Sequence, residues 1–273
     1  MTDYGMAMDF VAAHDLDEAL LAKSQHPDSQ LLAGGTDLMV EVNLAHHRPS
    51  RIISLRRVGE LKETAHRRIG AGATWAHLER SPYRGLAQAA RTVGSPQIRA
   101  AGTIGGNVGT ASPAGDGLPW IVAADASIEV RSKERGTRIV PWQEFFTGVK
   151  QTSIESDEII TAVVVPEDLP EAQEFAKVGV RNAMVISTVS CLVMRDDDGF
   201  RVALGSVAPT PMRATRAEEM INAETTITDA ALTEFGRIVS EEVRPITDHR
   251  STAEYRRHAA GVLASRLVER CLS

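Results

Sequence analysis

The chain has 273 residues, of which 43% are hydrophobic and 24% are charged, and its formal net charge is −6. This composition is sufficient for a normal core in one large domain or two smaller ones, and the acidic balance argues against an extended nucleic-acid-binding surface. The two cysteines, Cys191 and Cys271, are too few for a four-thiolate iron–sulfur cluster, a cysteine-built zinc site or a disulfide scaffold.

The N-terminal segment and the hydropathy pattern indicate where the protein works. Residues 1–10 include Asp3 and Asp9 and contain no basic stretch followed by an apolar run, so we expect no secretory signal. No apolar run approaches the roughly 20 residues that span a bilayer. We therefore expect a soluble, cytoplasmic protein without a membrane span. The scattered histidines, including His46-His47, do not have the spacing of metal ligands, so no metal site is expected.

The first elements predict a strand, a glycine turn and a helix in direct succession. Residues 15–22 have a helical apolar stripe, and residues 30–33 read as a short strand. Gly34-Gly35 follows at once, and Thr36 and Asp37 suit the start of a helix, in which we expect Asp37 to act as a cap. Residues 51–55 then read as a second strand.

The middle of the chain alternates strands and helices around one glycine-rich stretch. Residues 68–73 predict a strand, and residues 75–80 and 86–93 predict helices. Residues 94–117 combine many glycines with few charges and are interpreted as an ordered loop that wraps around another group. A hairpin over 127–131 and 138–140 follows, then a strand over 159–165.

The last third predicts a separate α+β domain. Residues 166–171 read as a linker, with the domain boundary at 168, and the strands form a three-stranded meander with a turn at Asp196–Gly199. The expected strands cover 174–180, 186–194 and 200–208, and the expected helices cover 217–222, 229–243 and 252–272. Ser251 and Glu254 have the spacing of a capping box for the last helix.

Two glycine motifs, about seventy residues apart, carry the functional argument. Bare backbone lets a ligand approach closely, and successive free N–H groups before a helix attract anions. The first motif, Ala33–Asp37, taken alone is more simply a tight strand-to-helix turn. The second, Thr103–Asp116, adds Asn107, Thr110 and Ser112, a density of short polar side chains that a purely structural loop rarely needs. Together they favour a site for an extended, phosphate-bearing ligand.

Both motifs resemble those of the flavin-binding medium subunits of the molybdenum hydroxylases, of the carbon monoxide dehydrogenase and xanthine dehydrogenase type. That family has an AGGT(D/H)L turn and a TIGGN stretch followed by ASPxGD, and this chain has Ala33–Leu38 and Thr103–Asp116 in those forms. The resemblance extends through Asp157–Ile160, Phe175–Lys177 and Tyr255–Arg257.

The resemblance implies an α+β protein that binds FAD non-covalently. The fold is expected to be a two-subdomain, PCMH/VAO-like FAD-binding domain over 1–168, with subdomains at about 1–57 and 58–168, followed by a C-terminal domain over 169–273 that has a three-stranded antiparallel sheet and a helical bundle. The residues expected to bind FAD are Leu32, Ala33, Gly34, Gly35, Thr36, Asp37, Thr103, Ile104, Gly105, Gly106, Asn107, Thr110, Asp116, Ile160 and Lys177. Among them, Leu32–Asp37 are expected at the diphosphate and Ile160 and Lys177 near the isoalloxazine ring.

The implied activity is electron transfer inside a larger complex. The resemblance implies a molybdopterin-binding large subunit and a small subunit with two-iron two-sulfur clusters as partners, in a heterotrimer or its dimer, with the flavin passing electrons to an external acceptor. No residue is expected to act as a general acid or base. Two alternatives remain: a stand-alone FAD-dependent oxidoreductase acting on a small molecule, and a module that has lost FAD. The intact Gly34-Gly35, Gly105-Gly106 and Asn107 argue against the second.

Overall fold

The computed structural model describes residues 8–65 and 67–272. The first seven residues, on which most of the expectation about a secretory signal depends, lie outside this range. Within it, no helix combines the length and the apolar character needed to cross a lipid bilayer.

The N-terminal lobe is a parallel three-stranded sheet built from two strand–helix–strand crossovers. The sheet order is β1-β3-β2, and β3 pairs in parallel with both neighbours. Its elements are β1 (Asp9–Ala12), α1 (Leu16–Gln25), β2 (Gln30–Leu32), α2 (Leu38–Asn43) and β3 (Arg51–Ser54). The predicted strand–turn–helix unit is therefore confirmed, and the first glycine turn lies at the carboxyl end of β2, the strand end where ligands of open parallel sheets usually bind.

The second lobe is an antiparallel five-stranded sheet in the order β4-β5-β10-β6-β7. Its strands are β4 (Thr64–Ala65), β5 (Arg68–Gly70), β6 (Ser127–Ser132), β7 (Gly136–Pro141) and β10 (Glu158–Val164). The central strand β10 comes last along the chain and is buried along nearly its whole length. The predicted hairpin is confirmed as β6–β7, where the turn ends at Gly136 with a φ of 73°.

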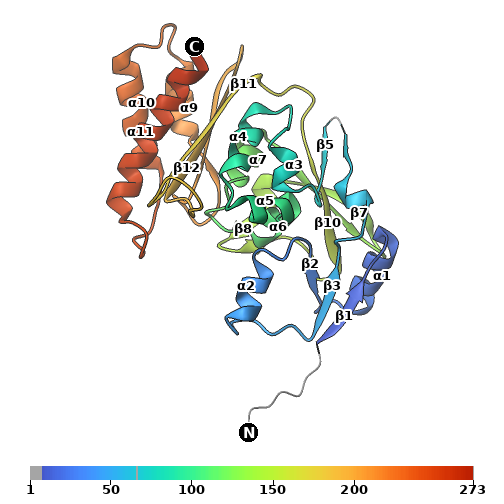
Figure 1. Ribbon diagram of the computed structural model, residues 1–273. Helices are drawn as coiled ribbons and strands as arrows, with labels where there is room; N and C mark the ends of the chain where they lie inside the picture. The colour runs from blue at the N-terminus through green and yellow to red at the C-terminus, as the bar shows by residue number, and fades with distance from the viewer. Residues whose placement is uncertain (1–7, 66, 273) are drawn as a thin grey trace.

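The chain forms several short helices between the end of β5 and the start of β6 in the sequence, and they lie at the centre of the molecule (Figure 1). They and the elements beside them are η1 (Glu60–Lys62), α3 (Trp75–Leu78), α4 (Arg84–Thr92), α5 (Pro96–Ala101), α6 (Ile104–Thr110), α7 (Leu118–Ala123), α8 (Trp142–Phe145), β8 (Phe146–Gly148) and β9 (Gln151–Thr152). The expectation that residues 94–117 form a loop was wrong, because α5 and α6 lie inside that stretch. Ser95 caps α5 with Pro96 at its first turn, and Thr103 caps α6.

The C-terminal domain packs helices on one face of an antiparallel sheet (Figure 1). The predicted three-stranded meander is confirmed as β11 (Ala172–Val178), β12 (Val189–Asp196) and β13 (Gly199–Gly205), and a short fourth strand, β14 (Met212–Arg213), extends it. The helices are α9 (Thr215–Asn222), α10 (Asp229–Glu242) and α11 (Ala253–Leu272). The predicted capping box placed Ser251 before the first residue of the last helix. In the structure Thr252 has this position, because its hydroxyl accepts a hydrogen bond from the Tyr255 amide at 3.2 Å, and the helix begins one residue later than predicted.

Three clusters of buried hydrophobic residues fill these layers. One lies under the N-terminal sheet around Leu20 and Leu61, and one lies between the C-terminal sheet and its helices around Phe235. The largest surrounds Trp120 in α7 and reaches across to Phe175 and Leu192 of the C-terminal sheet. The glycine-rich centre of the chain is therefore held between the two antiparallel sheets.

Candidate functional site

The first glycine motif presents a row of unpaired backbone N–H groups. The amides of Gly34, Gly35, Thr36 and Asp37 donate no hydrogen bond to any described residue, and α2 begins directly after them. Gly35 has a φ of 73°, which favours glycine. A phosphate would satisfy such amides at the positive end of a helix.

The second motif uses its N–H groups differently. The Ile104 amide donates to the Ala73 carbonyl at 3.0 Å, and the Gly105 amide donates to the Ala71 carbonyl at 2.8 Å. The Gly106 amide donates to Oγ1 of Thr103 at 3.0 Å. The start of α6 is therefore bonded to the protein itself. What α6 offers to a ligand is a surface without side chains, since Gly106 and Gly109 are exposed.

The two motifs lie against each other. A Cβ atom on Gly34 would lie 2.0 Å from the Ala101 carbonyl oxygen, so only glycine allows the first turn to approach the end of α5 so closely. The Thr110 hydroxyl donates to Oδ2 of Asp37 at 3.0 Å. The expectation that Asp37 caps α2 was wrong, because its carboxylate makes this bond and no capping bond.

Asn107 has a polar atom with no partner. Its Oδ1 is buried and accepts no hydrogen bond from the described residues. Cβ atoms on Gly115 and Gly117 would lie 2.7 Å from Nδ2 and 2.9 Å from Oδ1 of Asn107, so these two glycines make room for the amide. A buried acceptor without a donor is costly unless a ligand supplies one.

Asp116 and Lys177 form a buried ion pair between the second motif and β11. Nζ of Lys177 donates to Oδ2 of Asp116 at 2.6 Å, to the Thr92 carbonyl at 2.9 Å and to the Val185 carbonyl at 3.0 Å. The Ser187 hydroxyl donates to Oδ1 of Asp116. Burial raises the pKa of the Asp116 carboxyl, and the Lys177 ammonium and the hydrogen bonds from Lys177 and Ser187 oppose that shift. All three N–H groups of Lys177 are thus taken, so it can act on a ligand only through its charge.

The remaining predicted residues lie beside the first turn and on β10. Leu32, Ala33 and Thr36 are half-buried beside the first turn, and Ile160 on β10 is 8% exposed. Its Cδ1 would lie 3.3 Å from a Cβ on Gly109, so β10 packs directly under α6. The structure thus brings the first turn, α6 and β10 together, while Asp116 and Lys177 make a separate cluster at the domain junction.

Sequence reasoning missed the partners of that cluster. Thr92, Val185 and Ser187 surround Lys177 and Asp116, yet they lie at the end of the amphipathic helix α4 and in a connection without any motif. No spacing in the sequence marks them.

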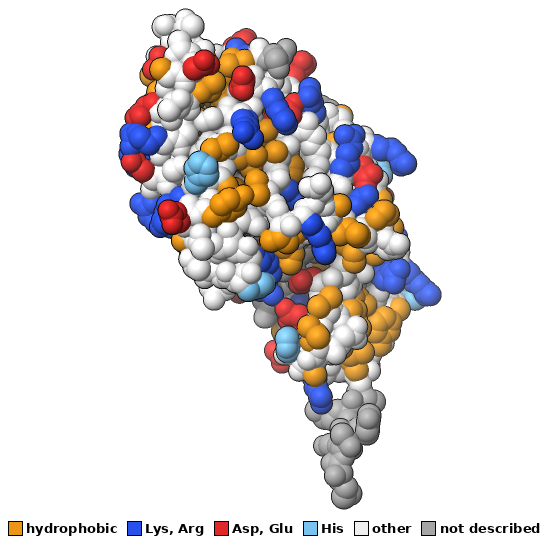
Figure 2. All heavy atoms as spheres, turned by 60° about the vertical axis from the view of Figure 1, so that its left-hand side comes forward, with side chains coloured by type: hydrophobic (Ala, Val, Ile, Leu, Met, Phe, Trp, Pro, Cys, Tyr) orange, Lys and Arg blue, Asp and Glu red, His pale blue; other side chains and the backbone are white. Residues whose placement is uncertain are grey.

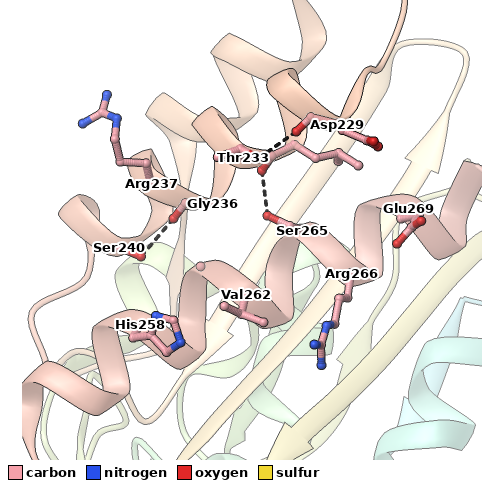
Figure 3. A pocket seen from close by; sticks show the side chains of 12 residues that line it. Asp229, Thr233, Gly236, Arg237, Ser240, His258, Val262, Ser265, Arg266 and Glu269 are labelled. Atoms are coloured by element: carbon pink, nitrogen blue, oxygen red, sulfur yellow. Dashed lines mark hydrogen bonds between the residues drawn. The ribbon is translucent and has the colours of Figure 1, made fainter.

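A groove between α10 and α11 is unrelated to the glycine motifs (Figure 3). The helices cross closely there, since a Cβ on Gly261 would lie 2.3 Å from the Gly236 carbonyl oxygen. The groove is lined by polar and charged side chains such as Arg237, His258 and Arg266, and it contains none of the predicted site residues. Within residues 8–65 and 67–272, no cluster of histidine, cysteine and acidic residues is arranged to hold a metal ion.

Comparison with known proteins agrees with this geometry. Residues 6–168 match the family described as the FAD binding domain in molybdopterin dehydrogenase, and residues 175–271 match the CO dehydrogenase flavoprotein C-terminal domain. The xanthine dehydrogenase FAD-binding subunit of Escherichia coli O157:H7 is 30% identical, with 97% of each chain covered. The nicotinate dehydrogenase FAD-subunit of Eubacterium barkeri is 35% identical, with 78% of this chain and 79% of that one covered.

A solved structure gives the same result for the whole chain. It is a carbon monoxide dehydrogenase from Hydrogenophaga pseudoflava that lacks the Mo-pyranopterin moiety of its cofactor, and one of its chains superposes with a TM-score of 0.87 at 28% identity, with 97% of both chains covered. The predicted family, fold class and cofactor are confirmed. With its FAD-binding domain and its flavoprotein C-terminal domain, this chain belongs to the FAD-binding medium subunits of the molybdopterin dehydrogenases, of the carbon monoxide dehydrogenase and xanthine dehydrogenase type.

Proposed function

We propose that this chain is the electron-transfer subunit of a multi-subunit molybdopterin-dependent dehydrogenase. In this proposal electrons arrive from two-iron two-sulfur clusters of a small subunit, after a molybdopterin-binding large subunit has oxidised the substrate, and they leave to an external acceptor. The subunit names of the relatives support an assembly of this kind. The observation that carries the cofactor part of the proposal is the row of unpaired amides at Gly34–Asp37, together with the unpartnered Oδ1 of Asn107.

The proposed FAD contacts follow from where free polar groups and bare backbone meet. Leu32–Asp37 would hold the diphosphate on the amides before α2. Thr103, Gly105, Gly106, Asn107 and Thr110 would face the ligand along α6, with Asn107 supplying its amide, whereas the Ile104 side chain is fully buried in the core. Ile160 would support the ring system from β10, and Asp116 and Lys177 would close the site from the domain junction.

The chemistry would come from FAD, which exchanges electrons one or two at a time. The chain would bind the cofactor, exclude water from it and set its electrostatic environment. Because the Lys177 ammonium is held in place by three acceptors, we propose that its fixed positive charge favours the reduced, anionic form of the ring.

We also propose that residues 1–168 form the FAD-binding domain, with subdomains at about 1–57 and 58–168, and that residues 169–273 form the second domain. Separate hydrophobic clusters around Leu20 and around Phe235 support this division. Exposed hydrophobic side chains support contact with partner subunits. They include Val40 and Leu44 at α2 and Val180, Met184 and Ile186 in the β11–β12 connection. Figure 2 shows hydrophobic patches between charged side chains on one face.

The test is purification from the native host, followed by an absorption spectrum, metal analysis and identification of co-purifying chains. The proposal expects a flavin band together with iron–sulfur absorbance, molybdenum and two further chains. A yellow protein that carries FAD, contains no metal and turns over a small molecule alone would contradict it in favour of a stand-alone oxidoreductase. For Lys177, an unchanged flavin reduction potential in Lys177→Ala would contradict the proposed electrostatic role.

A further inference from the structure

Arg256 on α11 is an unusually costly residue for a structural role alone. It is 3% exposed, and its Nε has no acceptor among the described residues. Nη1 donates to the carbonyls of Thr188 at 2.6 Å and Ser206 at 3.0 Å, and Nη2 donates to Oδ1 of Asp248 at 2.7 Å. Burying a guanidinium with one unsatisfied N–H costs free energy. We therefore ask what the groups that Arg256 does bond are connected to.

Ser206 connects Arg256 to the second glycine motif. Its φ is 65°, a left-handed conformation that a serine adopts only when its surroundings hold it there. Its amide donates to the Pro113 carbonyl at 2.7 Å, and its hydroxyl donates to the Ser187 carbonyl at 2.9 Å. Arg256 bonds the third polar group of the same residue, its carbonyl oxygen.

A second route runs through the end of the β11–β12 connection. Arg256 holds the Thr188 carbonyl, and the neighbouring Ser187 donates its hydroxyl to Asp116. Asp116 in turn pairs with Lys177. Two routes therefore lead from the C-terminal helix to the second glycine motif, each made of hydrogen bonds joined by a short piece of backbone. One passes through Ser206 to Pro113, and the other passes through Thr188 and Ser187 to Asp116.

We propose that Arg256 is a positioning residue for the FAD site. It fixes the carbonyls of Thr188 and Ser206, and through Ser187 it fixes the Asp116 carboxylate against Lys177. The inference rests on the proposed placement of Asp116 and Lys177 at the cofactor. Hydrogen bonds from a buried guanidinium fix the orientation of the groups that accept them, and small displacements of binding groups weaken a site strongly.

Arg213 provides a matched control. It is also a largely buried arginine in the C-terminal domain, and it pairs with Glu218 at 2.6 Å and across the domain junction with Asp125 at 3.1 Å. Among the residues that the structure describes, neither partner bonds a residue of the glycine motifs. Arg256→Met and Arg213→Met thus both remove a buried guanidinium, but only the first cuts the routes to Asp116 and Pro113.

The experiment measures FAD binding to the full-length apoprotein by quenching of flavin fluorescence, together with the melting temperature and the visible circular dichroism of bound FAD. Both variants are expected to melt earlier than the wild type. Arg256→Met should weaken FAD binding by about tenfold and alter the dichroism, whereas Arg213→Met should change the affinity by less than about twofold. Equal changes in affinity for the two variants would overturn the proposal.

Ser187→Ala tests the second route without removing a charge, because it deletes the hydroxyl that holds the Asp116 carboxylate, and it decides the question if Arg256→Met does not fold. It should lower the melting temperature, since a buried hydrogen bond to a charged group is lost, and it should weaken FAD binding more than Arg213→Met does. In the double variant Arg256→Met/Ser187→Ala, the loss should be smaller than the product of the single losses. Unchanged affinity in Ser187→Ala, or a fully multiplicative double variant, would overturn the proposal.

These outcomes are separable from failure of the proposed function. A wild-type chain that binds FAD but takes no electrons from an iron–sulfur partner would contradict the electron-transfer proposal and leave the affinity comparison standing. A wild-type chain that binds no FAD would overturn both.

Discussion

The Thr110 hydroxyl donates a hydrogen bond to the Asp37 carboxylate at 3.0 Å, which ties the last residue of α6 to the residue that precedes α2. The bond joins the N-terminal lobe to the helical centre of the molecule, where the two glycine motifs meet. The first motif, with its unpaired amides, is therefore held against the end of the helix that carries the second motif.

Gly34→Ala should separate the two motifs. The added Cβ would lie 2.0 Å from the Ala101 carbonyl oxygen, and a backbone atom cannot swing aside as a side chain can. We expect a loss of about 1–3 kcal/mol in unfolding free energy and FAD binding weaker by at least about tenfold. Gly59→Ala is the control, because a Cβ there meets nothing within 4 Å and its φ of −64° suits alanine. The prediction fails if the two variants bind FAD equally well.

Asn107→Ala should weaken FAD binding without destabilising the apoprotein. The buried Oδ1 of Asn107 has no donor within the described structure, so its removal relieves a cost of about 1–3 kcal/mol that the cofactor otherwise offsets. Ser190→Ala removes a second buried, unpartnered oxygen, on β12, and should leave FAD affinity unchanged. Urea unfolding of the apoproteins and FAD titration measure the two effects. An apoprotein of Asn107→Ala that is clearly less stable than the wild type would refute the explanation.

Asp116→Asn should destabilise the protein strongly. It preserves shape but leaves the Lys177 ammonium buried without a counterion, which costs about 3 kcal/mol or more. Asp125→Asn removes a carboxylate that also pairs with a basic residue, Arg213, but Asp125 is 42% exposed, so we expect a loss below about 1 kcal/mol. The denaturant midpoints of the two variants compare their stabilities directly. Equal losses of stability would show that the buried ion pair of Asp116 stabilises the protein no more than the exposed pair of Asp125.

Asp248 predicts a pH dependence of stability. Burial alone would raise its pKa, but hydrogen bonds from the Arg250 and Ser251 amides and from Arg256 outweigh this and lower the pKa to about 2. Because the folded pKa lies below the unfolded one, ionised Asp248 stabilises the fold above about pH 4, and this contribution is lost as the pH falls towards 2. Asp248→Asn should therefore be less stable than the wild type at pH 6, with the difference shrinking at pH 3.

The control for this measurement is Asp197→Asn, at an exposed position in the β12–β13 turn. Its difference from the wild type should stay small at every pH. A difference between Asp248→Asn and the wild type that does not narrow on acidification would contradict the assigned hydrogen bonds.

Local signals in the sequence were enough to predict much of the fold. The strand, double glycine and helix around Gly34 follow from a short apolar run, a flexible turn and helical spacing, and each of these acts within a few residues. Residues 94–117 could not be predicted in the same way, because their glycines lower helix propensity. Tertiary contacts override it, since Gly105 packs where a Cβ would lie 2.6 Å from Cβ of Ala71.

The hydrogen-bonded pairs of the candidate site could not be predicted from the sequence, for a different reason. Asp37 and Thr110 are 73 residues apart in the sequence, and Asp116 and Ser187 are 71 apart. Both bonds depend on how the lobes dock, which no local pattern encodes. The glycine motifs revealed which residues matter, but the role of Asp37 as a partner of Thr110 became visible only in three dimensions.

The position of β10 has a consequence for how the chain folds during synthesis. This strand lies between β5 and β6, so Ala162 pairs with Gly70 and Val163 with Ile128, yet it is the last of the five strands to leave the ribosome. Until then β5 and β6 each present an unpaired edge, the kind of edge that promotes aggregation. The first domain can therefore close only after about 164 residues have emerged, whereas the β11–β12–β13 meander pairs neighbours and can form as soon as it is made.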